Sequence, residues 1–224
     1  MIPAAGAPTV RAQMAKRIRL AVLLSGGGTT LQNLLDRITG GQLDAEVAVV
    51  VSSRADAFGL ERARHAGIPA LTVARKAHPD VQTFNDALHA ALEPHAVDLV
   101  VLAGFLSLFQ PRARYAGRVL NIHPALIPSF CGEGFYGHRV HEAVLASGVK
   151  VSGCTVHFAD EQYDRGPIIL QGCVPVLEDD TVETLAARVL ALEHELYPEA
   201  IQLFAENRLR VEGRRVRILP PTGG

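Results

Sequence analysis

The sequence has no tryptophan, only three cysteines and no long apolar run, and each shortage excludes a class of protein. Aromatic residues make up only 5% of the 224 residues, so Val, Leu, Ile and Ala must build the core, which the 48% hydrophobic content permits. The widely spaced Cys131, Cys154 and Cys173 fit neither a disulfide framework nor a zinc site. No segment approaches the roughly 18 apolar residues of a membrane span, so we expect no membrane partner.

The chain also lacks a strong net charge. Lys and Arg number 22 and Asp and Glu 23, which leaves a formal charge of -1 at pH 7. No positive field favours a nucleic-acid backbone, so small molecules are the expected partners. Residues 1–17 lack the apolar segment of a signal peptide, and we expect a disordered extension before a single cytoplasmic domain at 18–220. Whether this domain forms a homodimer stays open.

Short apolar runs alternate with helical patterns through the first half of the chain. We expect strands at 18–24, 47–51, 70–73, 97–103 and 119–122, and helices at 31–38, 56–65 and 83–92. This alternation predicts an α/β fold, a doubly wound and mostly parallel sheet with helices on both faces. Beyond residue 150 the pattern predicts antiparallel strands toward the C-terminal half, then one long helix and a hairpin: strands 151–158 and 168–176, a helix capped by Thr181, and a hairpin at 209–219.

A glycine-rich turn, SGGGTTLQ, follows the first expected strand and opens a helix. Glycines allow a tight turn that directs several N–H groups toward one point at the positive end of the helix, and Thr29 and Thr30 add hydroxyl groups. The turn matches neither the dinucleotide G-x-G-x-x-G pattern nor the P-loop pattern, so a phosphomonoester is the better candidate ligand. A tight turn without a ligand is the plainer alternative.

Two polar side chains end the last apolar run of the first half. Asn121 and His123 stand two residues apart in NIHP, so in a strand they share one face, and ligands gather at such strand ends. An amide can hold a developing oxyanion and an imidazole can move a proton near neutral pH, which suits acyl transfer. A structural histidine is the plainer alternative. His157 could face the same cleft, but a metal site there lacks a third ligand at local spacing.

The turn DEQYDRGP brings three acids, Asp160, Glu161 and Asp164. Acidic surface turns are common, so simple solvent exposure is the alternative for all three. A carboxylate within reach of His123 would raise the pKa of the imidazole and orient the ring. Gly166 and Pro167 fix the exit of the chain from Asp164, which makes it the best candidate of the three.

Six segments, taken together, match a known family in order from about residue 18 to 210: VLLSGGGTTLQ, ADAFGLERARHAGIP, VDLVVLAGF, GRVLNIHPALIPSF, GCTVHFADEQYDRGPIILQ and LEHELYP. On these segments the chain resembles the phosphoribosylglycinamide formyltransferase family. The resemblance implies an enzyme that transfers the formyl group of 10-formyltetrahydrofolate to the amine of glycinamide ribonucleotide in de novo purine (IMP) biosynthesis. It implies no metal.

The resemblance also implies roles for individual residues. Asn121, His123 and Asp164 correspond to the catalytic residues of the family. The residues that correspond to the ribonucleotide-binding positions are Gly28, Thr29, Thr30 and Glu193. Those that correspond to the folate-binding positions are Leu106, Ser107, Leu108, Phe109, Asn121, Asp160, Glu161, Gln162, Tyr163 and Asp164.

The sequence departs from the family pattern in two places. Val81 stands where some members carry an arginine that meets the folate tail, so Arg75 or Lys76 are the alternative candidates for that contact. The loop at 129–141 resembles a longer, GxGxYG variant, so the family pattern assigns no role to Cys131, Glu133 or His138.

Three other functions share some of these features. A formyltetrahydrofolate hydrolase carries a regulatory domain before a similar unit, whereas about 17 residues precede the first expected strand here. A methionyl-tRNA formyltransferase adds a basic C-terminal domain and favours a positive surface. A nucleotide-binding module without catalysis would explain the glycine-rich turn, but not the pairing of NIHP with DRGP.

Overall fold

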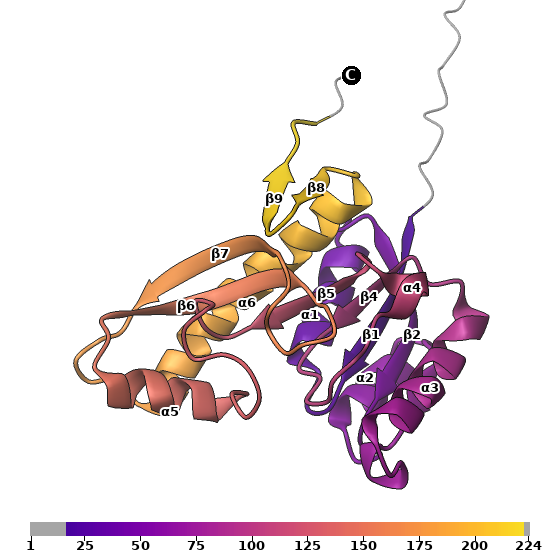
Figure 1. Ribbon diagram of the computed structural model, residues 1–224, viewed down its shortest axis with the longest axis horizontal. Coiled ribbons are helices and arrows are strands. Elements are labelled where there is room, and N and C mark those ends of the chain that lie inside the picture. The colour runs from indigo at the N-terminus through magenta and orange to yellow at the C-terminus, as the bar shows by residue number, and fades with distance from the viewer. Residues whose placement is uncertain (1–16, 222–224) are drawn as a thin grey trace, which may run out of the picture.

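The computed structural model describes residues 17–221, whose nine strands form one sheet in the order β3-β2-β1-β4-β5-β6-β7-β9-β8 (Figure 1). The first half contributes β1 (Ile18–Leu24), β2 (Ala45–Ser52), β3 (Ala70–Thr72), β4 (Leu99–Leu102) and β5 (Val119–His123), all parallel. The second half contributes β6 (Val151–Phe158), β7 (Ile168–Pro175), β8 (Leu209–Glu212) and β9 (Arg215–Ile218). β6 is antiparallel to β5, and β7 to β6. The predicted mostly parallel sheet with antiparallel strands in its second half is confirmed.

Helices cover both faces of the sheet, as predicted. They are α1 (Thr29–Thr39), α2 (Phe58–His65), α3 (Val81–Leu92), α4 (Arg112–Tyr115), α5 (His138–Ser147) and α6 (Val182–Ala205), with short 3₁₀ turns at Arg75–Ala77 and Glu93–His95. Alternate residues of β1 point to opposite faces because the side-chain period of a strand is two. Leu20 and Val22 join the core layer of α1, α2, α5 and α6, whereas Ala21 and Leu23 join the layer of α3. We call these the α6 layer and the α3 layer.

The longest helix, α6, is attached to two central strands by a buried tyrosine. It begins where the Thr181 side chain accepts a hydrogen bond from the Thr184 N–H, which satisfies one of the free donors of the first turn. The hydroxyl group of Tyr197, fully buried, lies 2.9 Å from the Leu102 carbonyl oxygen and 2.8 Å from that of Leu120. The Tyr197 hydroxyl group therefore connects α6 to the neighbouring strands β4 and β5.

Helix α5 was missed by the sequence prediction. It starts directly after Gly137, whose φ of 53° lies in the left-handed region, and buries Val140 and Val144 on one face. The preceding glycine-rich loop has no periodicity, and within the ten residues of α5 only Val140 and Val144 are buried apolar residues, so its pattern is too short to stand out.

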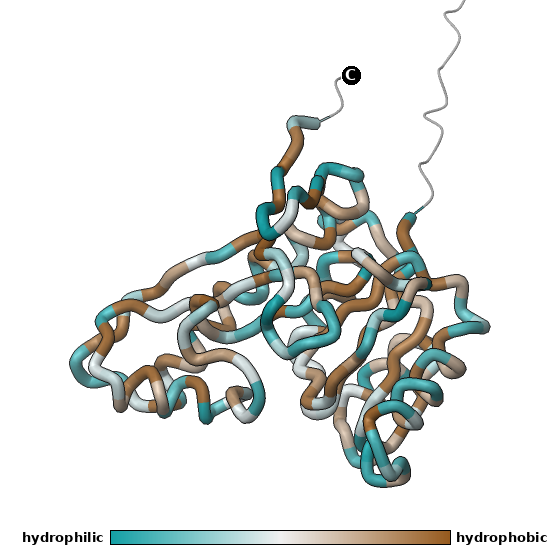
Figure 2. Tube along the Cα trace, viewed as in Figure 1, coloured by the Kyte–Doolittle hydropathy of each residue, from teal (hydrophilic) through white to brown (hydrophobic). Residues whose placement is uncertain are grey.

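Apolar residues concentrate on the inner strands, and polar residues cover the outward faces of the helices (Figure 2). None of the helices in the described residues is both long and apolar enough to cross a membrane. The extension predicted for residues 1–17 lies outside the described residues, except for Arg17.

Candidate active site

A cavity of about 830 Å³ opens at the carboxyl ends of the parallel strands, where ligands gather in open α/β sheets. Its walls come from the glycine-rich turn, the segments 104–109, 121–124 and 132–141, the turn at 157–164, and one side of α6. The two features singled out in the sequence, the glycine-rich turn and the polar cluster, therefore face one space. Of the predicted site residues, Gly28 and Glu161 do not line this cavity; Gly27 lines it instead of Gly28.

The structure brings Asn121, His123 and Asp164 together, with His157 as a fourth member. The Asn121 amide donates to His157 Nε2 at 3.0 Å and to Asp164 Oδ1 at 3.2 Å. His157 Nδ1 donates to the Phe158 carbonyl oxygen at 2.9 Å, and Nε2 of the same ring also lies 3.6 Å from Asp164 Oδ1. Both amide hydrogens of Asn121 are thus engaged, so an oxyanion can take one of them only if a bond opens, and the bond to Asp164 is the longer of the two.

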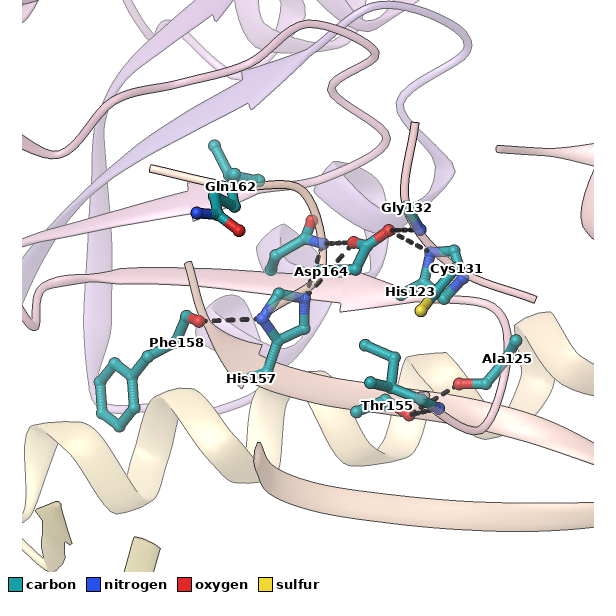
Figure 3. Close-up of polar contacts among 12 residues, drawn as sticks. His123, Ala125, Cys131, Gly132, Thr155, His157, Phe158, Gln162 and Asp164 are labelled. Atoms are coloured by element: carbon teal, nitrogen blue, oxygen red, sulfur yellow. Dashed lines mark hydrogen bonds and ion pairs between the residues drawn. The ribbon is translucent and has the colours of Figure 1, made fainter. Parts of the chain in front are cut away.

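Asp164 joins two loops at the centre of this cluster (Figure 3). Its Oδ2 atom accepts the backbone N–H of Gly132 at 2.9 Å, so the carboxylate holds the loop before α5 against the turn after β6. Its φ of 55° is uncommon for a residue with a side chain. Burial alone would raise the pKa of Asp164, but the contacts with His157, His123 and Gly132 lower it below its ordinary value. The carboxylate is therefore charged at neutral pH.

Both ring nitrogens of His123 face acceptors. Nε2 donates to the Phe130 carbonyl oxygen at 2.8 Å, and Nδ1 lies 3.6 Å from Asp164 Oδ2. This arrangement suits the imidazolium form, which has a donor on each nitrogen. Burial nevertheless lowers the pKa of His123, and the charge of Asp164 opposes that effect. The balance between burial and Asp164 thus sets the protonation of His123.

The glycine-rich turn is held from behind by close packing. Gly28 is the N-cap of α1 with a φ of 71°, and a Cβ atom there would lie 2.7 Å from the Gly59 Cα atom. Arg62 donates to the Gly27 carbonyl oxygen at 2.9 Å and to the Gln32 side chain at 3.0 Å. Gly28 therefore shapes the turn, while Gly27 and the residues Thr29 and Thr30 face the cavity.

Glu193 lines the cavity from α6, in the α6 layer, and it is only 9% exposed. No described residue forms a hydrogen bond or ion pair with its carboxyl group, and burial raises the pKa of Glu193 to about 8. A carboxyl group of this kind can donate and accept hydrogen bonds at neutral pH, which suits a pair of ligand hydroxyl groups.

The segment Leu106–Phe109 forms the cavity wall on the α3 layer, to which Phe109 belongs. Two buried residues that the sequence prediction missed hold this segment. The Ser25 hydroxyl group accepts the Leu106 N–H at 2.9 Å. The Asn85 amide donates to the Leu108 carbonyl oxygen at 3.1 Å and accepts the Gln110 N–H at 2.8 Å. Asn85 stands among apolar helix positions in the sequence, and this buried polar exception was the signal that could have identified it.

The position that the family resemblance assigns to the folate tail, Val81, lies at the start of α3. Val81 begins α3, is exposed, and does not line the cavity. Arg75 packs with its guanidinium 5.6 Å from the centre of the Phe84 ring. Burial raises the pKa of Tyr163, and the charge of Arg75 counters this, so Arg75 lies within electrostatic reach of the turn at 160–164.

Among the described residues, no group of three or more His, Cys, Asp and Glu side chains is arranged to hold a metal ion. The cysteines Cys131, Cys154 and Cys173 are all free.

Comparison with known proteins identifies the family of this chain. The formyl transferase family model matches residues 18–201. The phosphoribosylglycinamide formyltransferase of Haemophilus influenzae is 40% identical over 196 residues, which cover 87% of this chain and 90% of that protein. A trifunctional purine biosynthetic protein of Bos taurus is 43% identical over 198 residues, 88% of this chain but 19% of that protein, so the chain spans about a fifth of that relative.

Among solved structures, glycinamide ribonucleotide transformylase 1 from Symbiobacterium toebii has a TM-score of 0.85 and 50% sequence identity, and the match covers 97% of this chain and 100% of that one. Both the sequence and the fold are thus matched along almost the whole length. The chain therefore belongs to the formyl transferase family, among the phosphoribosylglycinamide formyltransferases.

Proposed function

We propose that this chain transfers the formyl group of 10-formyltetrahydrofolate to the amine of glycinamide ribonucleotide, giving formylglycinamide ribonucleotide and tetrahydrofolate in de novo purine biosynthesis. The observation that carries this proposal is the position of the His123–Asp164–Asn121 cluster in the same cavity as the glycine-rich turn. Family membership supports it. One cavity can then hold both a phosphorylated substrate and a formyl donor.

The two substrates would occupy opposite ends of the cavity. Thr29, Thr30 and Glu193 belong to α1 and α6, so the ribonucleotide would lie on the α6 layer, with its phosphate at the helix start and its ribose hydroxyl groups at Glu193. The folate would lie on the α3 layer, between Leu106–Phe109 and the turn at 160–164. The formyl group and the amine would then meet at β5, beside Asn121 and His123.

The chemistry needs one new bond and one broken bond. The free amine, with a pKa of about 8, attacks the formyl carbon and forms a carbon–nitrogen bond. The imidazolium form of His123 stabilises the resulting oxyanion, although burial lowers the pKa of His123 and so reduces the fraction in this form at neutral pH. Asn121 contributes the hydrogen that it now shares with Asp164. The bond between the formyl carbon and N10 of the folate then breaks as a proton passes from the amine to N10. Asp164 keeps the imidazole oriented and compensates its charge.

An assay of folate product with and without glycinamide ribonucleotide tests this proposal. Tetrahydrofolate should appear only when the ribonucleotide is present, and the formylated nucleotide should appear in equal amount. Release of formate without the ribonucleotide would instead support a hydrolase. Binding of ribose phosphates with no formyl transfer would instead support a nucleotide-binding module.

We also keep the cytoplasm as the proposed compartment and a homodimer as a proposed assembly. Cell fractionation tests the first. Light scattering of the purified chain over a range of concentrations tests the second.

A further inference from the structure

The cavity has very few positive charges for a site that would hold two anionic substrates. Among the described residues that line it, Arg139 is the only arginine or lysine. Four carboxyl groups line the same cavity: Glu133, Asp160, Asp164 and Glu193. A phosphomonoester carries close to two negative charges at neutral pH, and its binding in such surroundings calls for a fixed cation besides backbone N–H groups.

Arg139 is free to meet a ligand. No described residue forms an ion pair or hydrogen bond with its guanidinium group, which lies 4.9 Å from the centre of the Tyr136 ring. Stacking on an aromatic ring restricts the guanidinium while leaving its N–H groups available. Arg188, by contrast, is occupied by Asp180 and the Pro175 carbonyl oxygen.

The position of Arg139 favours the phosphate over the folate tail. Arg139 is the second residue of α5, and the core residues Val140 and Val144 of this helix belong to the α6 layer, together with Leu31 of α1. In Figure 1 the segment that leads into α5 lies at the end of that helix nearer the N-terminal half of the chain. Arg75, the cation near Tyr163, packs instead on Phe84 of the α3 layer.

No other wall of the α6 layer offers such a charge. Helix α6 presents Ala186, Val189 and Leu190 to the cavity besides Glu193, and α1 presents Thr29 and Thr30. Arg62 lies behind the glycine-rich turn, where its guanidinium is used by the Gly27 carbonyl oxygen and Gln32. His138 also lines the cavity, but an imidazole is not a fixed charge at neutral pH.

We propose that Arg139, held over Tyr136, is the cation that binds the phosphate group of the ribonucleotide substrate from the α5 side of the cavity. The assignment to a ribonucleotide rests on the proposed function above. Arg139 then acts as a determinant of specificity, since it favours the phosphorylated substrate over the corresponding nucleoside.

The test compares Arg139→Met and Arg139→Lys with the wild type. Arg139→Met should raise KM for glycinamide ribonucleotide and Kd for ribose 5-phosphate about tenfold, the usual worth of a charged hydrogen bond, with KM for the formyl donor within about twofold. Arg139→Lys should recover part of the loss, because lysine keeps the positive charge but lacks the planar set of N–H donors of a guanidinium group. With the unphosphorylated glycinamide riboside, wild type and Arg139→Met should differ by less than about twofold.

A matched control is Arg114→Met, since Arg114 also stacks on a tyrosine, 5.5 Å from the centre of the Tyr115 ring, but lies outside the cavity. It should leave both constants unchanged. A rise in KM for the formyl donor alone, or an equal loss with the riboside, would overturn the assignment. Unchanged constants in a folded Arg139→Met would overturn it too. The Kd for ribose 5-phosphate is measured without turnover, so it tests the contact between Arg139 and the phosphate even if the formyl transfer proposal fails.

Discussion

The Nδ1 atom of His123 lies 3.6 Å from the Oδ2 atom of Asp164, while Nε2 of the same ring donates to the Phe130 carbonyl oxygen. Burial lowers the pKa of the imidazole, and the carboxylate charge opposes this change. The charge of Asp164 therefore influences the protonation of His123 in a site that is largely buried. Asp164→Asn removes this charge, and its amide nitrogen also replaces one of the two oxygens that accept hydrogen bonds from Asn121 and Gly132. The pH dependence of kcat, rather than its height, therefore reports the charge.

Asp164→Asn should lower kcat about a hundredfold or more, because the protonated imidazole loses the charge that stabilises it. The pKa of His123 is already lowered by burial and should fall further in the variant. The protonated fraction at a given pH then decreases. The limb of the kcat profile that falls as His123 loses its proton should therefore move to lower pH, as steady-state kinetics from pH 5 to 9 would measure.

The control for this variant is Asp160→Asn in the same turn. Asp160 is exposed and accepts the Gln162 N–H, and it forms no contact with His123. Its pH profile should keep the wild-type limbs. An Asp164→Asn profile that drops in height without any shift would contradict the charge argument.

Gly166→Ala should disrupt the turn that carries Asp164. A Cβ atom at Gly166 would lie 1.7 Å from the Phe158 carbonyl oxygen, a backbone atom that cannot move aside without breaking the end of β6. We expect a loss of roughly 2–4 kcal/mol in the free energy of unfolding and a large fall in kcat. Urea unfolding and steady-state kinetics measure the two.

Gly213→Ala is the control for Gly166→Ala, because it tests the backbone cost of replacing a glycine without a close steric contact. Gly213 has a φ of 62° in the hairpin between β8 and β9, with open space around the missing Cβ atom. It should cost about 1 kcal/mol through its backbone alone, with kinetics unchanged. If Gly166→Ala behaved in the same way, the close approach to Phe158 would not matter for the site.

The sequence predicted local elements and strand-end residues well, because both follow from short-range patterns. The range of β1 was predicted to the residue, and Asn121 and His123 were expected at the end of the strand that is β5. Alternation also predicted that His157 could face the same cleft, and its bond to Asn121 confirms that proximity. Composition could not select Asp164 from three acids; the resemblance did.

The features that were missed depend on contacts distant in sequence. Asn85 is 23 residues from Leu108, which it holds, and although its place among apolar helix positions marks it as an exception, the local sequence does not identify this partner. A role for Arg139 follows only from the packing of α5 in the α6 layer, and the sequence prediction missed α5 itself. The spacing of residues along the chain does not predict contacts of this kind between distant segments.

Asn85→Leu should weaken binding of the folate more than binding of the ribonucleotide. The variant keeps a side chain of similar size but leaves the Leu108 carbonyl oxygen and the Gln110 N–H without their partner. Each unmade buried hydrogen bond costs about 1–3 kcal/mol, and the loosened segment is the one that lines the α3 layer of the cavity. KM for the formyl donor should rise at least about fivefold, as initial rates at saturating ribonucleotide would measure. An equal rise in both KM values would argue against a local role.

Glu193→Gln should stabilise the protein, and more so as the pH rises. Burial raises the pKa of Glu193 to about 8, whereas an unfolded glutamate has its ordinary pKa of 4.5. Below about pH 4.5 both states hold the proton, so the group does not affect the free energy of unfolding. Between pH 4.5 and 8 the unfolded state loses its proton first, so the wild type loses stability as the pH rises, and above pH 8 the loss is complete.

A neutral amide of nearly the same shape removes this titration. The stability difference between Glu193→Gln and wild type should therefore grow from near zero at pH 4.5 to roughly 4–5 kcal/mol at pH 8.5, in urea unfolding at several pH values. Glu195→Gln on the exposed side of α6 is the control, with an expected change within about 0.5 kcal/mol at every pH. A difference that does not vary with pH would mean that Glu193 is charged in the folded protein, and its proposed role toward the ribose hydroxyl groups would then reduce to that of an acceptor alone.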